Sequence, residues 1–182
     1  REAERPLLEA GVPLMARASW ALAQVALAEL GMNGGERGVA PVARPRALVL
    51  VGSGNNGGDA LHAGALLADA GVQVDVVPVA KRWHQEGMDA ALAAGAKVVE
   101  HLVGAPSAAY DLIIDGILGT GTGADPSLRG EAADIVDKLW EFIQQADVWP
   151  HVIAVDVPSG LHPDTGESRG SVLAADTTVT LG

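Results

Sequence analysis

The chain has 182 residues and a formal net charge of −11, with 48% hydrophobic but only 3% aromatic residues. A chain of this length and hydrophobic content usually folds around one packed core, so we expect a single domain over residues 1–182. The excess of acidic residues argues against binding to a nucleic-acid backbone, and the scarcity of aromatic rings argues against base-stacking platforms.

Cysteine is absent from the sequence. The chain therefore contains no disulfide, no thiolate metal site and no cysteine nucleophile, which suits a reducing compartment. No apolar run approaches the roughly 20 residues that span a bilayer, and acidic residues near the start argue against a signal peptide. We therefore expect a cytoplasmic protein that binds neither membranes nor nucleic acid.

Short continuous apolar runs, typical of strands buried on both faces, alternate along the chain with helical periodicities. An amphipathic helix is predicted within residues 1–30, and a Gly/Pro-rich connector follows it over 31–45. The remaining predicted elements are, in chain order, a strand at 46–52, a helix at 59–71, a strand at 72–79, a helix at 84–96 broken early by Gly87, a short strand at 97–101, a strand at 110–119, a helix at 131–146, a strand at 151–160 and a strand at 176–182. This alternation predicts an α/β sandwich with a mainly parallel central sheet.

The segment GSGNNGGDA connects the first predicted strand to the helix after it. Gly52, Gly54 and Gly57 match the G-x-G-x-x-G spacing that holds a dinucleotide pyrophosphate against a helix N-terminus. Asp75, in the next strand, lies about where a dehydrogenase places the carboxylate that binds the cofactor ribose. Asp59, in the predicted first turn of the helix, is either its N-cap or a ligand contact. The spacing alone leaves a structural turn, a dehydrogenase and another dinucleotide-binding protein open.

Polar side chains also follow two other predicted strands. Asp115 ends one apolar run and precedes the glycine-rich loop 119–123, while Asp156 ends another and precedes Ser159. Ligands bind open α/β sheets at the carboxyl ends of the strands, so neighbouring strands would bring these groups into one crevice. Asn56, Asp115 and Ser159 offer only oxygen atoms, the ligand type that a hard cation prefers. The alternative is that each carboxylate caps a neighbouring loop.

The segments GSGNNGGDA, DLIIDGILGTGTG and VIAVDVPSGLHPDTG, in this order and spacing, resemble the NAD(P)H-hydrate epimerases, the YjeF N-terminal domain family. AGVPLMARASWALA and AADTTVTLG resemble the first helix and last strand of that family, so the resemblance covers essentially the whole chain. It implies a three-layer, Rossmann-like α/β sandwich and an isomerase of cofactor repair. The implied reaction interconverts the R and S forms of NADH or NADPH hydrated at C6, for a separate S-specific dehydratase.

The resemblance also implies roles for individual residues. The implied substrate-binding residues are Asn55, Asn56, Gly57, Gly58, Asp59, Gly119, Thr120, Gly121, Thr122, Gly123, Ala124, Asp125 and Asp156. Asn56, Asp115 and Ser159 are the implied ligands of a potassium ion, and Asp156 is the residue that we expect to act as acid/base catalyst. A homodimer is expected, as is a functional or covalent link to an ADP/ATP-dependent NAD(P)H-hydrate dehydratase, whose domain would then follow Gly182.

The sequence departs from the family pattern at several positions. Ala60 stands where the family usually has glycine, and Gly116 stands where it usually has alanine. Thr122 replaces a larger apolar residue, and the variant loop around Asp125 makes the role of that residue the least direct. These departures remove none of the implied cation ligands and leave Asp156 in place.

Two other functions stay open at this level. A non-catalytic nucleotide- or protein-binding module of the same fold would be expected to lose the NNGGD or VDVPSG motif, and this chain keeps both. An NAD(P)-dependent oxidoreductase would need a second catalytic constellation, which the sequence does not display.

Overall fold

Six parallel strands form one sheet in the order β3-β2-β1-β4-β5-β6, in a computed structural model that describes residues 14–32, 44–99, 110–121, 125–146 and 148–181. The strands are β1 (Arg46–Val51), β2 (Gln73–Pro78), β3 (Lys97–Val98), β4 (Leu112–Gly116), β5 (His151–Val155) and β6 (Thr177–Val179). The helices are α2 (Leu14–Glu29), α3 (Asn55–Asp69), α4 (Gln85–Ala93) and α5 (Glu131–Gln145). The predicted parallel α/β sandwich is confirmed.

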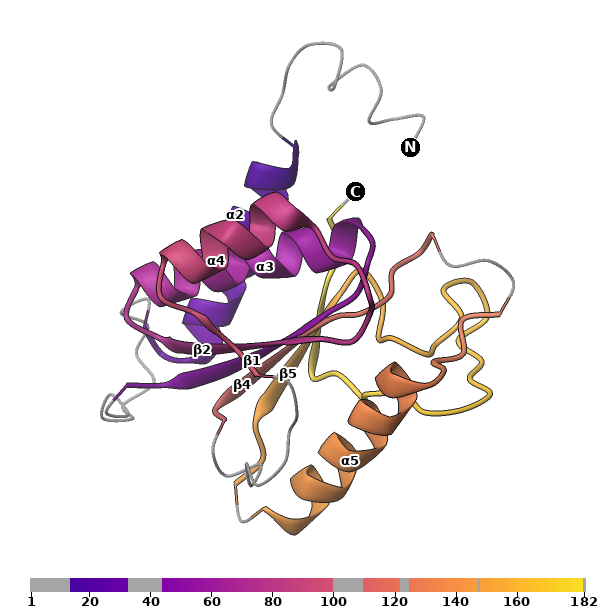
Figure 1. The fold of residues 1–182 in the computed structure, drawn as a ribbon. Helices are drawn as coiled ribbons and strands as arrows, with labels where there is room; N and C mark the ends of the chain where they lie inside the picture. The colour runs from indigo at the N-terminus through magenta and orange to yellow at the C-terminus, as the bar shows by residue number, and fades with distance from the viewer. Residues whose placement is uncertain (1–13, 33–43, 100–109, 122–124, 147, 182) are drawn as a thin grey trace.

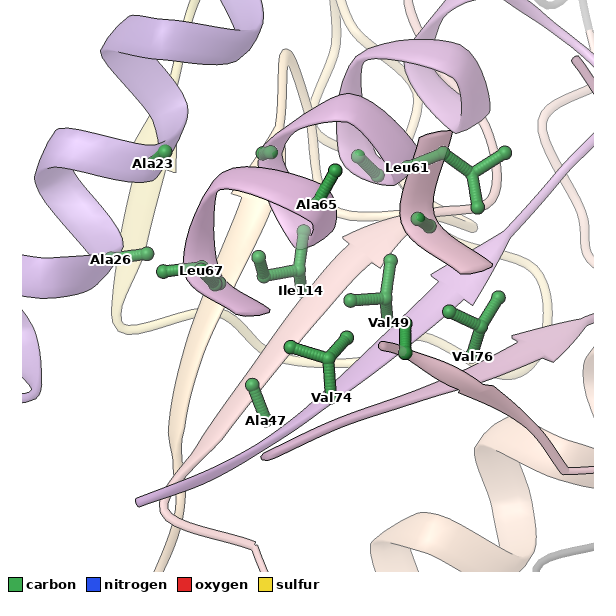
Figure 2. Close-up of a cluster of buried hydrophobic side chains, with 14 of the residues drawn as sticks. Ala23, Ala26, Ala47, Val49, Leu61, Ala65, Leu67, Val74, Val76 and Ile114 are labelled. Carbon is green, nitrogen blue, oxygen red and sulfur yellow. The ribbon is translucent and has the colours of Figure 1, made fainter. Parts of the chain in front are cut away.

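The sheet is covered on both faces. Helices α2, α3 and α4 lie on one face and α5 lies on the other (Figure 1). Alternate residues of β1 therefore enter different cores: Ala47 and Val49 pack under α2 and α3 (Figure 2), while Leu48 and Leu50 pack towards α5. Burial of both faces explains why β1 reads as a continuous apolar run and not as an alternating one.

Two predicted helix features are wrong. Helix α3 begins at Asn55, four residues earlier than predicted, and its N-cap is Gly54, so Asp59 lies inside the helix and does not cap it. Gly87 does not break α4: the helix passes through it, and His84 Nδ1 caps the helix by accepting from the Gly87 N–H at 3.1 Å. A Cβ on Gly87 would lie only 3.0 Å from the Leu61 Cβ, so close packing of α4 on α3 overrides the low helix propensity of glycine.

Strands β1 to β3 follow one another towards one side of the sheet, and β4 to β6 follow one another towards the other. The direction of winding therefore reverses between β1 and β4. In such sheets the crevice outside the carboxyl ends of the strands, at this point, is the usual ligand site. The glycine-rich turn follows β1, Asp115 lies near the end of β4 and Asp156 directly follows β5, so the predicted groups share this edge. Within the described ranges, no helix has the length and apolarity needed to cross a bilayer.

Candidate active site at the carboxyl ends of β1, β4 and β5

Asn56 joins the three strand ends. Its Nδ2 donates to the Val155 carbonyl at 2.8 Å and to the Leu118 carbonyl at 3.3 Å. These carbonyls belong to the end of β5 and to the loop after β4, whereas Asn56 lies in the first turn of α3. Because both bonds use the amide N–H groups, the amide oxygen is left as an acceptor for another group.

Asp115 and Ser159 form a buried pair with no exposed surface. The Ser159 hydroxyl donates to Asp115 Oδ1 at 2.6 Å and the Ser159 N–H donates to Oδ2 at 2.8 Å, while the Ile117 N–H adds a bond of 3.2 Å to Oδ1. Burial raises the pKa of Asp115, and the hydrogen bonds from Ser159 and Ile117 act against that rise. The pair fixes the loop after β4 to the loop after β5.

The grouped polar atoms fit a cation that prefers oxygen. Ser159 Oγ accepts from the Leu118 N–H at 2.9 Å and donates to Asp115, so the hydroxyl keeps one lone pair. An amide, a hydroxyl and a carboxylate therefore meet within one hydrogen-bonded unit. Among the described residues, no group of three or more His, Cys, Asp or Glu side chains is placed to hold a metal ion. This chemistry suits a hard cation and gives a transition metal no cluster of imidazole or carboxylate ligands.

Asp156 follows β5 directly and has a strained backbone. Its φ of 66° lies in the left-handed region, which residues other than glycine seldom adopt. The Asp156 N–H donates to the Val179 carbonyl at 2.9 Å, and Oδ1 accepts from the Leu181 N–H at 3.0 Å, so β6 and the residues after it hold this conformation. Such strain costs about 1–3 kcal/mol and is concentrated at functional sites.

Asp59 is the second carboxyl group near Asp156, and only 7% of its surface is exposed. Burial raises its pKa to about 6, and the negative charge of Asp156 acts in the same direction. Ser19 Oγ of α2, itself buried, lies 3.4 Å from Asp59 Oδ1. Sequence reasoning missed Ser19, because a single serine within an alanine-rich helix, 40 residues before its partner, carries no motif.

The glycine-rich turn brings α3 close to the sheet. A Cβ on Gly57 would collide with the Gly52 carbonyl, so glycine at this position permits the approach. Gly54 caps α3 without a side-chain hydrogen bond, and Gly58 is buried in the same turn. The N–H groups at the start of α3 are therefore free of a side-chain cap and can face an anionic ligand.

The loop after β4 is described in part. Gly119 lies against the Asn56 side chain, and Thr120 and Gly121 are exposed. Thr122, Gly123 and Ala124 lie outside the described residues. Asp125 is exposed and bonds within its own loop, to Ser127 and Arg129, and hydrogen bonding lowers its pKa to about 2. These contacts do not bring Asp125 into the strand-end cluster.

Two of the departures from the family pattern, Ala60 and Gly116, lie against each other in the structure. A Cβ on Gly116 would lie 2.6 Å from the Ala60 Cβ, and 3.0 Å from the Asn56 carbonyl oxygen. The methyl group that the resemblance leads us to expect on β4 therefore sits here on α3, at the same interface. The exchange preserves the space under the first turns of α3, and with it the position of Asn56.

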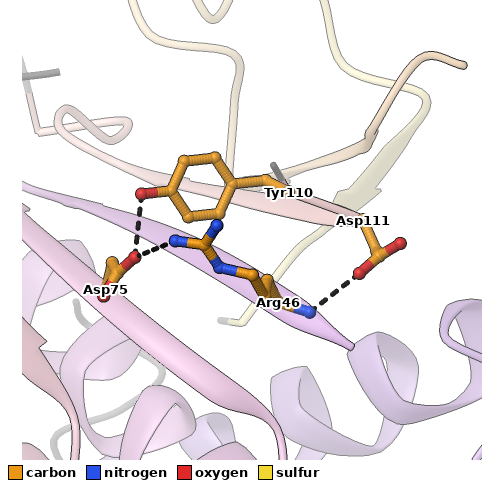
Figure 3. Close-up of polar contacts among 4 residues, drawn as sticks. All are labelled: Arg46, Asp75, Tyr110 and Asp111. Carbon is orange, nitrogen blue, oxygen red and sulfur yellow. Dashed lines mark hydrogen bonds and ion pairs between the residues drawn. The ribbon is translucent and has the colours of Figure 1, made fainter. Parts of the chain in front are cut away.

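The expectation that Asp75 could bind a ribose is wrong. Asp75 lies towards the amino end of β2, where its Oδ2 accepts from Arg46 Nη2 at 2.8 Å and from the Tyr110 hydroxyl at 2.9 Å (Figure 3). A cavity of about 460 Å³ opens at this same edge, lined in part by Arg46, Asp75 and Lys97. The carboxyl ends of α3 and α4 also face it, and helix carboxyl ends disfavour an anionic pyrophosphate. The predicted site residues Asn56, Asp115, Asp156 and Ser159 lie at the opposite edge.

The chain resembles proteins of known family along its whole length. The family model for the YjeF-related protein N-terminus matches residues 11–182. The NAD(P)H-hydrate epimerase of Microbacterium testaceum is 48% identical over 183 residues, which cover 100% of this chain and 66% of that protein. The NAD(P)H-hydrate epimerase of Clavibacter sepedonicus is 46% identical, with 100% of this chain and 76% of that protein covered.

Two further similarities concern longer proteins and the fold. The bifunctional NAD(P)H-hydrate repair enzyme Nnr of Mycobacterium leprae is 39% identical over 100% of this chain, which spans only 36% of that enzyme. The crystal structure of the yeast protein YNL200c has a TM-score of 0.76 at 21% identity, with 97% of this chain and 75% of that chain covered. The yeast structure confirms the Rossmann-like architecture.

Proposed function

Because the chain belongs to the family of YjeF-related protein N-termini, we propose that it is an isomerase that interconverts the R and S forms of NADH or NADPH hydrated at C6. The observation that carries the proposal is the convergence of Asn56, Asp115, Asp156 and Ser159 at the ends of adjacent strands. The names of the relatives that match the whole chain support the same reaction.

The substrate binds between the start of α3 and the loop after β4. Asn55, Asn56 and Gly57 present the unpaired backbone N–H groups of the first turn of α3, which favours the pyrophosphate. Gly119 lies against the Asn56 side chain on the neighbouring side of the crevice, and the exposed Thr120 and Gly121 that follow it are available to the ribose and nicotinamide. The net charge of −11 is no obstacle here, because backbone dipoles act locally while distant charges are screened.

Asn56, Asp115 and Ser159 would hold a potassium ion in this crevice. Their contacts fit that role, since the Asn56 amide oxygen and one Ser159 lone pair remain available and the buried Asp115 lacks an ionic partner among the described residues. When bound, the ion supplies positive charge beside the substrate pyrophosphate and the buried carboxylate. The protein residues alone carry the proton transfers described next.

Epimerisation requires the C6 hydroxyl to leave and to return on the other face of the ring. The lone pair of the adjacent ring nitrogen expels the hydroxyl, which takes a proton from an acid and departs as water. Water then adds to the opposite face of C6 and returns a proton to a base. Asp156 performs this proton transfer, and Asp59, whose pKa is raised to about 6, is a second carboxyl group that can exchange a proton in the same pH range.

The test is a coupled assay on a mixture of R and S NADH hydrates. An excess of S-specific dehydratase consumes the S form, and recovery of NADH absorbance then follows the R form in the presence of potassium. We expect this protein to accelerate consumption of the R form over the spontaneous rate. Hydrate binding without acceleration would identify a binding module, and absence of binding would overturn the proposal altogether.

The proposal extends to partners and location. A homodimer in the cytoplasm, linked functionally or covalently to an ADP/ATP-dependent dehydratase, is the arrangement that we propose. The bifunctional relative from Mycobacterium leprae supports the link, because one chain there carries both the matched region and further sequence. Light scattering of the purified protein measures its oligomeric state directly, and a monomer at all concentrations would contradict the dimer.

A further inference from the structure

The loop between β2 and α4 lies beside the glycine-rich turn. Strand β2 is the neighbour of β1, and the two are parallel, so both end at the edge that carries the active site. The Val79 N–H donates to the Val51 carbonyl at 2.9 Å, and a Cβ on Gly58 would lie 3.1 Å from the His84 ring. The loop from Val79 to His84 is therefore attached to the end of β1 at its start and lies against the first turn of α3 at its end.

This loop carries two adjacent cations on its surface. Lys81 and Arg82 are both exposed, in a chain with 12 basic residues and 23 acidic ones. Neither side chain forms an ion pair or a hydrogen bond with another described residue. Trp83, next to them, exposes 38% of its surface and offers an aromatic face on which an adenine ring can stack. The positive charges of Lys81 and Arg82 are therefore available to a ligand.

The end of β2 also lacks the group that would favour an unphosphorylated ribose. In Rossmann-type sites, a carboxylate near this position binds the ribose 2′-hydroxyl, whereas an arginine accommodates a 2′-phosphate. The carboxylate of β2, Asp75, is engaged by Arg46 and Tyr110 at the other edge of the sheet. From Val76 to Ala80 the sequence VVPVA contains no acidic residue, and the two cations follow it directly.

On the basis of the proposed function, we propose that Lys81 and Arg82 bind the 2′-phosphate of the adenosine ribose, so that the enzyme prefers hydrated NADPH to hydrated NADH. Lysine contributes a point charge and arginine a planar fork that can bind two phosphate oxygens. The N-terminus of α4, which begins at Gln85, lies next to the two cations, but Glu86 in its first turn carries a negative charge, so the proposal rests on Lys81 and Arg82.

The experiment compares both hydrates in the coupled assay with wild-type protein, Arg82→Ala and Lys81→Ala. Loss of one hydrogen-bonded charge should raise KM for the NADPH hydrate by about tenfold, with a much smaller change for the NADH hydrate. Lys97→Ala is the matched control, because it removes one exposed positive charge at the amino-end edge of the sheet. Equal changes for the two hydrates, or an effect of Lys97→Ala as large as that of Arg82→Ala, would overturn the proposal.

A binding measurement separates this inference from the proposed reaction. Calorimetric titrations with 2′-phospho-ADP-ribose and with ADP-ribose require no epimerisation. We expect tighter binding of the 2′-phosphorylated probe to wild-type protein and loss of that preference in Arg82→Ala. If the protein prefers the 2′-phosphorylated probe but shows no epimerase activity, the proposed reaction is refuted and the proposed phosphate site is supported. Epimerase activity without any preference between the two probes would keep the reaction and refute the phosphate site.

Discussion

The carboxylates at the two edges of the sheet differ in whether a basic side chain is paired with them. At the amino-end edge, Asp75 is paired with Arg46 and Tyr110, and Asp111 accepts from the Arg46 N–H at 2.8 Å (Figure 3). At the carboxyl-end edge, Asp115 and Asp156 have no lysine or arginine partner among the described residues. Carboxylates neutralised by fixed partners stabilise the fold, whereas carboxylates without a cation are available to a substrate or an added ion.

The largest expected difference between the edges is in catalysis. Asp156→Asn should lower the rate of R-hydrate consumption by about 100-fold or more, because general acid/base groups contribute about 10²–10⁴. Asparagine tolerates the left-handed backbone of this position, so the fold should be kept. Asp111→Asn makes the same chemical change at the other edge and should leave the rate unchanged. Wild-type turnover by Asp156→Asn would remove this residue from the mechanism.

The cation hypothesis predicts a loss of potassium dependence. Asn56→Ala removes the amide oxygen and should raise the potassium concentration needed for half-maximal activity by about tenfold or more. The change also leaves the Val155 and Leu118 carbonyls without their donor, so unfolding must be measured alongside activity. A potassium titration that matches wild type, in a variant that remains folded, would refute Asn56 as a ligand.

The buried carboxyl group of Asp59 should make stability depend on pH. Its pKa rises from 3.8 to about 6 on folding, so the folded state binds more protons than the unfolded state between these values. The free energy of unfolding therefore falls as pH rises from about 4 to about 6. The two-unit shift corresponds to at most about 3 kcal/mol. Urea unfolding at pH 4 and pH 7 should show a smaller fall for Asp59→Asn than for wild type, and equal falls would contradict the shift.

The exchange between Ala60 and Gly116 predicts strong coupling of two substitutions. Gly116→Ala forces a methyl group against Ala60, and overpacking of this kind costs about 1–3 kcal/mol. The double variant Ala60→Gly with Gly116→Ala moves the methyl group back to β4 and should recover much of that loss. Thermal unfolding of the single and double variants gives the coupling energy directly. Additive effects would show that the two positions are independent.

The sequence predicts well what depends on local pattern. Apolar runs identify the buried strands, and the polar groups that follow them, such as Asp115 and Ser159, are together in the structure because β4 and β5 are neighbours. Contacts between distant segments were not predictable from pattern. Ser19 and Asp59 are 40 residues apart, and Arg46 and Asp75 are 29 apart, so no local rule pairs them. Gly87 was misread for the same reason, since its role is set by packing against Leu61.

The smallest expected effect belongs to the amino-end edge. Tyr110→Phe removes the hydroxyl that donates to Asp75, while Arg46 still pairs with that carboxylate and still lies 4.8 Å from the centre of the aromatic ring. Burial and the contact with Asp75 raise the pKa of Tyr110 to about 12, so the hydroxyl stays a donor at neutral pH. Its loss should lower the free energy of unfolding by about 1 kcal/mol. Epimerase kinetics should not change, because the proposed active site lies at the other edge. A slower reaction without a loss of stability would mean that the two edges are coupled.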